Sequence, residues 1–170
     1  MIKAYFSGEK IVSSSPEAFS LYEKSRLGEK KHGKIEYSGV ETLYLIREGK
    51  MEFFSGKKVL NEDVLIRKLK KRDKKIEVKL EVFSDLKQKG CIIKTALKFG
   101  ADFRVYEKGI KPEEGHARWI VFCVKENEAM KWHEFAAKSR VAHSTKKNLL
   151  IGVLDEEGDV TYYEVAWLRP

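Results

Sequence analysis

The chain has 170 residues, 42% of them hydrophobic, and a formal net charge of +8. This length is enough for one domain or for two small domains that bury a core. No apolar run approaches the ~18 residues that a membrane-spanning helix needs, and the N-terminus lacks the apolar stretch of a signal peptide. We therefore expect a soluble, intracellular, cytoplasmic protein without a membrane partner.

The positive charge is concentrated in the first half of the chain. Residues 1–75 contain 18 Lys and Arg against 11 Asp and Glu, a net of +7, whereas residues 76–170 contain 16 against 15, a net of +1. A basic chain favours a polyanionic partner such as nucleic acid. The basic run 67–75 is also explained by a solvated helix face. Lys and Glu are frequent and side-chain amides are rare, a composition typical of thermophiles.

Neither the cysteines nor the histidines predict a metal site. Cys91 and Cys123 lie far apart in apolar contexts, which is typical of buried free thiols. The four histidines lack the spacing of zinc ligands. The run 77–79 matches the Glu-x-Lys pattern of metal-dependent nucleases, but we interpret it as chance in a chain so rich in both residues. We expect no metal and no other cofactor.

Turn and capping signals divide the first half into short strands and helices. Ser38 and Glu41 have the spacing of a capping box, and Asn61 can cap a further helix. The segment 25–34 is polar and contains glycine, so we expect a loop there. The expected strands are 2–6, 10–13 and 51–54, and the expected helices are 16–24, 39–48 and 61–72.

The second half begins with a helix and continues with strands. Ile76, Leu80, Phe83 and Leu86 form an apolar stripe at helical spacing, ended by Gly90. One more helix is expected at about 130–138, while 139–146 fits neither pattern. The segments rich in β-branched and aromatic residues are 91–95, 102–106, 117–125, 148–154 and 160–168.

The fold class that these elements predict is α+β. We place the domain boundary near residue 75, without a flexible linker. Residues 1–75 would form a small basic N-terminal α/β domain. Residues 76–170 would form a β-rich α/β domain.

Three residues of the second half carry groups that can cleave RNA without a metal ion. Tyr106 ends an expected strand, His116 follows a short loop, and Lys147 precedes an apolar run. When the RNA 2′-hydroxyl is the nucleophile, the reaction needs a base, an acid and a cation beside the phosphate. Histidine, with an ordinary pKa near ~6.5, suits the acid, whereas a tyrosine needs a nearby cation to act as a base. Taken singly, each residue also has an ordinary explanation: Tyr106 as a packed ring, His116 as a loop histidine and Lys147 as a surface charge.

The segments around these residues resemble the archaeal tRNA-splicing endonucleases. The run 94–106, KTALKFGADFRVY, resembles the family signature before its catalytic tyrosine, and the run 140–147, RVAHSTKK, resembles the segment that ends in its lysine. The similarity extends through the whole chain and is strongest from about residue 80 onward. It implies a catalytic domain with a mixed sheet flanked by helices. It also implies that Tyr106 is the general base, His116 the general acid and Lys147 the transition-state cation, with Lys146 as the rival lysine.

The same resemblance implies the substrate. The family excises introns from precursor tRNA at bulge-helix-bulge sites without metal, leaving 2′,3′-cyclic phosphate and 5′-hydroxyl ends. It holds a flipped bulge base between an arginine and a second flat or cationic side chain. Arg140 matches the arginine, and its partner is Trp167 or Arg169. We favour Trp167 because a base can stack between guanidinium and indole, although a half-buried strand residue is the ordinary explanation for this tryptophan.

The acidic loop 155–159 is unusual in a protein that binds RNA. The family docks such a loop into a neighbouring subunit and pairs its last strand with a second copy. The length of this chain is similar to that of the homotetrameric type, so a homotetramer is expected. Two other functions stay open: a non-catalytic RNA-binding subunit of a splicing complex, and a metal-dependent DNA nuclease.

Overall fold

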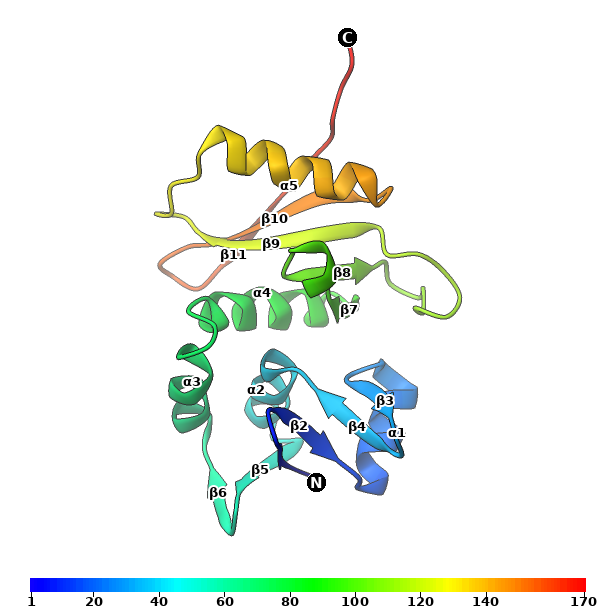
Figure 1. Cartoon of the computed structure of the whole chain (residues 1–170), viewed down its shortest axis with the longest axis vertical. Coiled ribbons are helices and arrows are strands. Elements are labelled where there is room, and N and C mark those ends of the chain that lie inside the picture. The colour runs from blue at the N-terminus through cyan, green and yellow to red at the C-terminus, as the bar shows by residue number, and fades with distance from the viewer. The chain divides into compact units, whose positions relative to one another are not determined.

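Two units make up the chain in a computed structural model that describes all residues from 1 to 170 (Figure 1). The first unit is Met1–Leu80 and the second is Glu81–Pro170. The division falls inside helix α4 (Ile76–Gln88), so the chain passes from one unit to the other as a helix. None of the helices is both long and apolar enough to span a membrane.

The first unit contains a six-stranded mixed sheet in the order β3-β4-β2-β1-β5-β6. Strands β1 and β5 pair in parallel, and every other pair is antiparallel. The strands are β1 (Ile2–Ser7), β2 (Lys10–Ser13), β3 (Glu29–Lys31), β4 (Lys34–Tyr37), β5 (Met51–Ser55) and β6 (Lys58–Leu60).

Side-chain caps begin the three helices of this unit, α1 (Pro16–Ser25), α2 (Gly39–Arg47) and α3 (Glu62–Lys70). The capping box predicted before α2 is confirmed, since Ser38 and Glu41 each accept a hydrogen bond from the other's backbone N–H. Asn61 caps α3 by accepting a hydrogen bond from the backbone of Val64 at 3.0 Å. The polar residues at these positions satisfy N–H groups that would otherwise lack partners.

The loop expected at 25–34 is confirmed at 26–28 but is wrong from residue 29 onward, because β3 and β4 form a hairpin there. His32 and Gly33 make its turn with φ values of 48° and 72°, the backbone that tight hairpins require. The missing signal has a physical reason. Strand β3 lies at the edge of the sheet and carries polar side chains, so it shows no apolar alternation.

The second unit is built on a five-stranded mixed sheet in the order β11-β10-β9-β8-β7. Strands β9 and β10 are parallel, and the other neighbours are antiparallel. All five strands expected after Gly90 are present, although the last ends at Val165 and not at residue 168. They are β7 (Ile92–Thr95), β8 (Phe103–Tyr106), β9 (Trp119–Lys125), β10 (Asn148–Leu154) and β11 (Val160–Val165).

Helices cover both faces of this second sheet (Figure 1). On one face, Ala142 of α5 (Trp132–Ser144) packs in a cluster with Ile120 and Leu149. On the other face, the Phe83 ring of α4 lies 5.7 Å from the Phe103 ring of β8. The expected mixed sheet flanked by helices is confirmed, and so is the α+β class.

Helix α5 is longer than the segment 130–138 predicted for it. It continues to Ser144 and ends in a Schellman motif, in which the N–H groups of Lys146 and Lys147 donate to the carbonyls of His143 and Ala142 at 3.0 and 2.9 Å. Lys146 has a φ of 56°. Glycine usually occupies this left-handed position. Because a lysine stands there, the sequence carries no signal for the end of the helix.

Candidate active site

Strand register brings the ends of β8, β9 and β10 together at one end of the second sheet. Val105 near the end of β8 pairs with Trp119 at the start of β9, and Trp119 pairs with Asn148 at the start of β10. The Arg118 N–H donates to the Val105 carbonyl, and the Asn148 N–H donates to the Arg118 carbonyl, each at 2.9 Å. Backbone hydrogen bonds therefore fix this junction.

All three predicted catalytic residues adjoin that junction. Tyr106 directly follows Val105, Lys147 directly precedes Asn148, and His116 lies three residues before Trp119. The three segments are far apart in the sequence but are neighbours through the sheet. A phenol, an imidazole and an ammonium group are therefore carried by segments that lie at one end of the sheet.

Tyr106 and His116 differ in exposure. Tyr106 is only 5% exposed, whereas His116 is exposed in the loop between β8 and β9. An ion pair between Glu107 and Arg118 closes this loop at its base. No hydrogen bond ties the Tyr106 hydroxyl or the His116 ring to another group of the chain, so both are available to a substrate.

Lys147 is positioned by the end of α5. The Schellman motif fixes its backbone, and its half-buried side chain donates from Nζ to the Thr145 carbonyl at 3.0 Å. Nζ also lies 5.9 Å from the centre of the Phe99 ring. Lys146 is exposed and belongs to the turn itself. Of the two lysines, Lys147 is therefore the one whose side chain is held by neighbouring groups of the chain.

A second cation lies on the same face of β8 as Tyr106. Arg104 precedes Tyr106 by two residues, so both side chains project from one side of the strand. The Nε atom of Arg104 is buried without a hydrogen-bond partner, and Lys94 of β7 stands directly opposite Arg104. A buried donor without a partner needs an explanation, and a phosphate oxygen would supply one. Sequence reasoning missed Arg104, although its alternation with Tyr106 was readable.

Two other tyrosines are poorly suited to act as a base. Burial raises the pKa of Tyr37, because the phenolate is disfavoured away from water. Burial likewise raises the pKa of Tyr162, and its hydrogen bond to the Asp85 carboxylate at 2.7 Å raises it further. Both hydroxyls stay protonated over the ordinary pH range.

Arg140 and Trp167, the predicted RNA-binding residues, line one hollow of about 590 Å³. Trp167 is 55% exposed and lies beyond the end of β11 at Val165. The explanation of Trp167 as a half-buried strand residue is therefore wrong. The Arg169 guanidinium lies 5.0 Å from the Trp167 ring, and Arg169 is not among the residues that line the hollow. The lining residues are Phe135, Ala136, Ser139, Arg140, His143, Ser144 and Trp167.

Sequence reasoning missed His143 as part of this hollow. Its ring lies 4.3 Å from the Trp167 ring at an interplanar angle of 78°. The signal was its position three residues after Arg140, because residues at this spacing share one face of a helix. The sequence predicted a helix only to residue 138, so the helical spacing of Arg140 and His143 became visible only in the structure, where α5 continues to Ser144.

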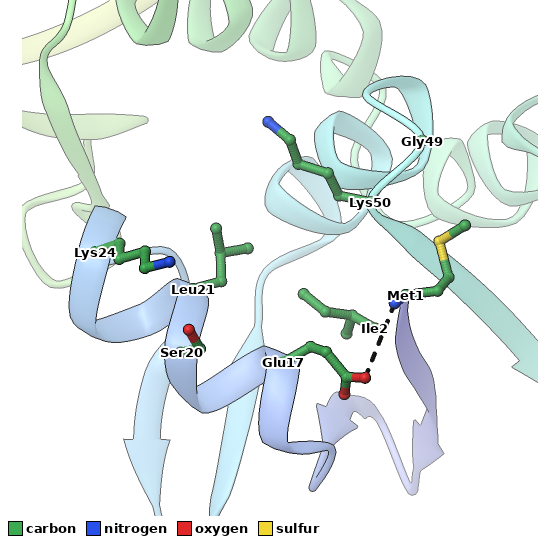
Figure 2. Close-up of a pocket in the computed structure, with 8 residues that line it drawn as sticks. All are labelled: Met1, Ile2, Glu17, Ser20, Leu21, Lys24, Gly49 and Lys50. Atoms are coloured by element: carbon green, nitrogen blue, oxygen red, sulfur yellow. Dashed lines mark ion pairs between the residues drawn. The ribbon is translucent and has the colours of Figure 1, made fainter.

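The N-terminal unit has a hollow of its own, of about 400 Å³ (Figure 2). The Met1 ammonium and the Glu17 carboxylate lie 4.0 Å apart in it. Its lining contains no aromatic ring that could stack on a nucleobase and no histidine that could transfer a proton. We therefore place no active site there. The lining residues are Met1, Ile2, Glu17, Ser20, Leu21, Lys24, Gly49 and Lys50.

The acidic loop 155–159 is an ordered turn between β10 and β11. The Asp155 carboxylate accepts hydrogen bonds from the N–H groups of Glu157 and Asp159, each at 2.9 Å. The Glu156 N–H donates to the Glu126 carboxylate at 3.0 Å. Such a turn presents its remaining carboxylates in one fixed shape.

Nowhere in the chain do three or more His, Cys, Asp or Glu residues gather as a metal site.

Comparison with known proteins gives the same family for both units. Residues 2–66 match the family described as tRNA intron endonuclease, N-terminal domain, and residues 76–162 match the family described as tRNA intron endonuclease, catalytic C-terminal domain. The chain is 37% identical to the tRNA-splicing endonuclease of Thermococcus gammatolerans over 170 residues, which cover 99% of both chains. It is 36% identical to that of Pyrococcus horikoshii over 169 residues, 99% of this chain and 97% of the relative. With the enzyme of Methanothermobacter thermautotrophicus it shares 33% over 165 residues, 96% of each.

Proposed function

Because the chain belongs to the tRNA intron endonuclease family and is an enzyme of tRNA splicing, we propose that it cuts precursor tRNA at bulge-helix-bulge sites by attack of the RNA's own 2′-hydroxyl. The observation that supports this proposal is that strand pairing brings the segments carrying Tyr106, His116 and Lys147 to the same end of the second sheet. Packing of the sheet does not by itself require a phenol, an imidazole and an ammonium group near one strand junction.

In the proposed reaction, Tyr106 removes the proton from the 2′-hydroxyl, and the freed oxygen attacks the adjacent phosphorus. The bond from phosphorus to the 5′-oxygen then breaks, and His116 donates a proton to that oxygen. Lys147 stabilises the extra negative charge on the phosphate oxygens as the new bond forms. The products are a 2′,3′-cyclic phosphate and a 5′-hydroxyl, and no metal takes part.

The positive surroundings of Tyr106 support this assignment. Arg104 and Lys94 stand opposite each other on the Tyr106 face of the sheet. Two cationic residues on this face favour the approach of a polyanion such as an RNA backbone. A buried Arg104 Nε without a partner fits the same role.

We further propose that the hollow between Arg140 and Trp167 takes one flipped base of the bulge. The guanidinium and the indole would lie on opposite sides of the base. For the assembly, we propose a homotetramer. Strand β11 is an edge strand of its sheet and is open to pairing with a second copy, and the ordered acidic loop 155–159 would dock into a neighbouring subunit.

The test is incubation of the purified protein with a bulge-helix-bulge precursor tRNA in excess EDTA, followed by end-group analysis of the fragments. We expect release of the intron with cyclic-phosphate and 5′-hydroxyl ends. Tight binding without cleavage would instead favour the non-catalytic RNA-binding subunit. Cleavage that appears only after Mg²⁺ is added would contradict the metal-free mechanism.

A further inference from the structure

Trp167 lies on a segment that backbone pairing does not hold. Strand β11 ends at Val165, and residues 166–170 form neither helix nor strand. The indole is 55% exposed. A large ring on such a segment has many accessible rotamers, and ordering it only when a base arrives would weaken binding. Something else must therefore hold the ring if it is to serve as a wall of the hollow.

His143 makes the contact that can hold it. Its ring meets the Trp167 indole nearly edge to face, with centroids 4.3 Å apart and planes at 78°, an arrangement favoured by the quadrupoles of the two rings. His143 projects from α5 in the last turn before the Schellman motif. The ring therefore has a rigid base, whereas the indole has none.

Helix α5 also carries Arg140 on the same face. Arg140 and His143 are three residues apart and line the same hollow. The helix therefore fixes the backbone of Arg140 directly and positions the indole through His143. Arg169 also contacts the indole, but it lies on the same unpaired segment, so only His143 connects the indole to the helix that carries Arg140.

We propose that His143 is a positioning residue, whose ring holds Trp167 so that indole and guanidinium leave a gap for one RNA base. This inference rests on the proposed function, because the base is that of the bulge. His143 acts before the chemical step. Its loss should weaken capture of the RNA and leave the reaction of the captured RNA unchanged.

The contact is tested first in the free protein, by acrylamide quenching of tryptophan fluorescence. The contribution of Trp167 is the difference between each protein and the same protein carrying Trp167→Phe. We expect His143→Ala to raise the quenching of Trp167 about two-fold, since loss of the ring contact frees the indole. His143→Phe, which retains an aromatic edge, should restore the original value. His133→Ala is the matched control, because His133 is an exposed histidine of the same helix outside the hollow.

The consequence for RNA is tested by single-turnover cleavage over a range of enzyme concentrations. His143→Ala should raise the half-saturating concentration about five-fold, the size expected for one aromatic pair, with the maximal rate unchanged. His143→Phe should recover most of the loss. Unchanged quenching and unchanged saturation would overturn the inference, and so would a lower maximal rate at unchanged saturation. If wild-type protein fails to cleave the precursor, the proposed function fails, while the quenching experiment still decides whether His143 holds Trp167.

Discussion

The two candidate regions of the second unit are held together in different ways. At the sheet end, hydrogen bonds of 2.9 Å between backbone groups join Arg118 to Val105 and to Asn148, and the proposed catalytic residues are their near neighbours. At the hollow, a helix supplies one wall, and a ring contact holds the other. The first region is fixed by the fold itself, and the second by a few side chains.

This difference suggests a division of labour. Proton transfer needs reacting groups placed with small error, because misplacement by about 1 Å can cost ~10²-fold in rate, and backbone pairing fixes the strand ends beside Tyr106 and Lys147. Holding an unstacked base needs only two flat surfaces, which tolerate some motion. Changes at the sheet end should therefore lower the rate of cleavage, and changes at the hollow should lower the affinity for RNA.

The largest effect is expected at the sheet end. Tyr106→Phe and His116→Ala should each lower the single-turnover cleavage rate by roughly 10²–10⁴-fold, the usual contribution of one proton-transfer group. Neither change removes a hydrogen bond within the chain, so the melting temperature should change little for the exposed His116. RNA affinity, measured by filter binding in EDTA, should stay within about two-fold of wild type.

If Tyr106→Phe and His116→Ala each lowered RNA affinity as much as the cleavage rate, their roles in proton transfer would be contradicted. The sheet end and the hollow would then no longer differ in function. His32→Ala is a matched control for His116→Ala, since His32 is an exposed histidine in the β3–β4 turn of the first unit. It should leave the cleavage rate unchanged.

Much of the fold could be read from the sequence, because its signals are local. The capping box at Ser38 and the apolar stripe from Ile76 depend only on residues within one helix. Strand β3 could not be read, because its polar residues reflect its place at the edge of the sheet. The end of α5 could not be read either, because Lys146 adopts a conformation that sequence rules assign to glycine.

The candidate site was less accessible to sequence reasoning than the fold. Tyr106, His116 and Lys147 are not a motif by spacing, and only the pairing of three strands makes them neighbours. The resemblance to a family predicted these three residues, but it did not predict that their segments are connected through Trp119 of β9. Arg104 was missed because its significance lies in an unpaired buried atom, a property that no sequence pattern reports.

A smaller effect is expected at the hollow. Arg140→Ala and Trp167→Ala should each weaken binding of a bulge-containing RNA by about 5–150-fold, corresponding to the ~1–3 kcal/mol of one base stacked on a side chain. Cleavage of the saturated complex should fall much less than binding. Binding titrations with a bulged RNA, and with a fully paired duplex of the same length, measure the effect.

The paired duplex is the control, because it has no unstacked base to place in the hollow. Both variants should bind it about as well as wild type, apart from the small effect of removing one positive charge in Arg140→Ala. An equal loss on both RNAs would show that Arg140 and Trp167 contribute only general affinity. The hollow would then have no part in recognising the bulge.

The smallest effect is expected at the joint between the two regions, where α5 turns into β10. Lys146 there has a φ of 56°, a conformation that costs a non-glycine residue about 1–2 kcal/mol. Lys146→Gly should relieve that cost and raise the free energy of unfolding by about 0.5–1 kcal/mol, after subtraction of the entropy that glycine loses on folding. Chemical denaturation of both proteins measures the difference.

The same variant separates the two lysines. Lys146→Gly should leave the cleavage rate unchanged, because the Schellman hydrogen bonds that position Lys147 come from backbone groups and persist. Lys147→Ala should lower the rate and leave that backbone motif in place. If Lys146→Gly instead slowed cleavage as much as Lys147→Ala, the assignment of Lys147 as the transition-state cation would be contradicted in favour of Lys146.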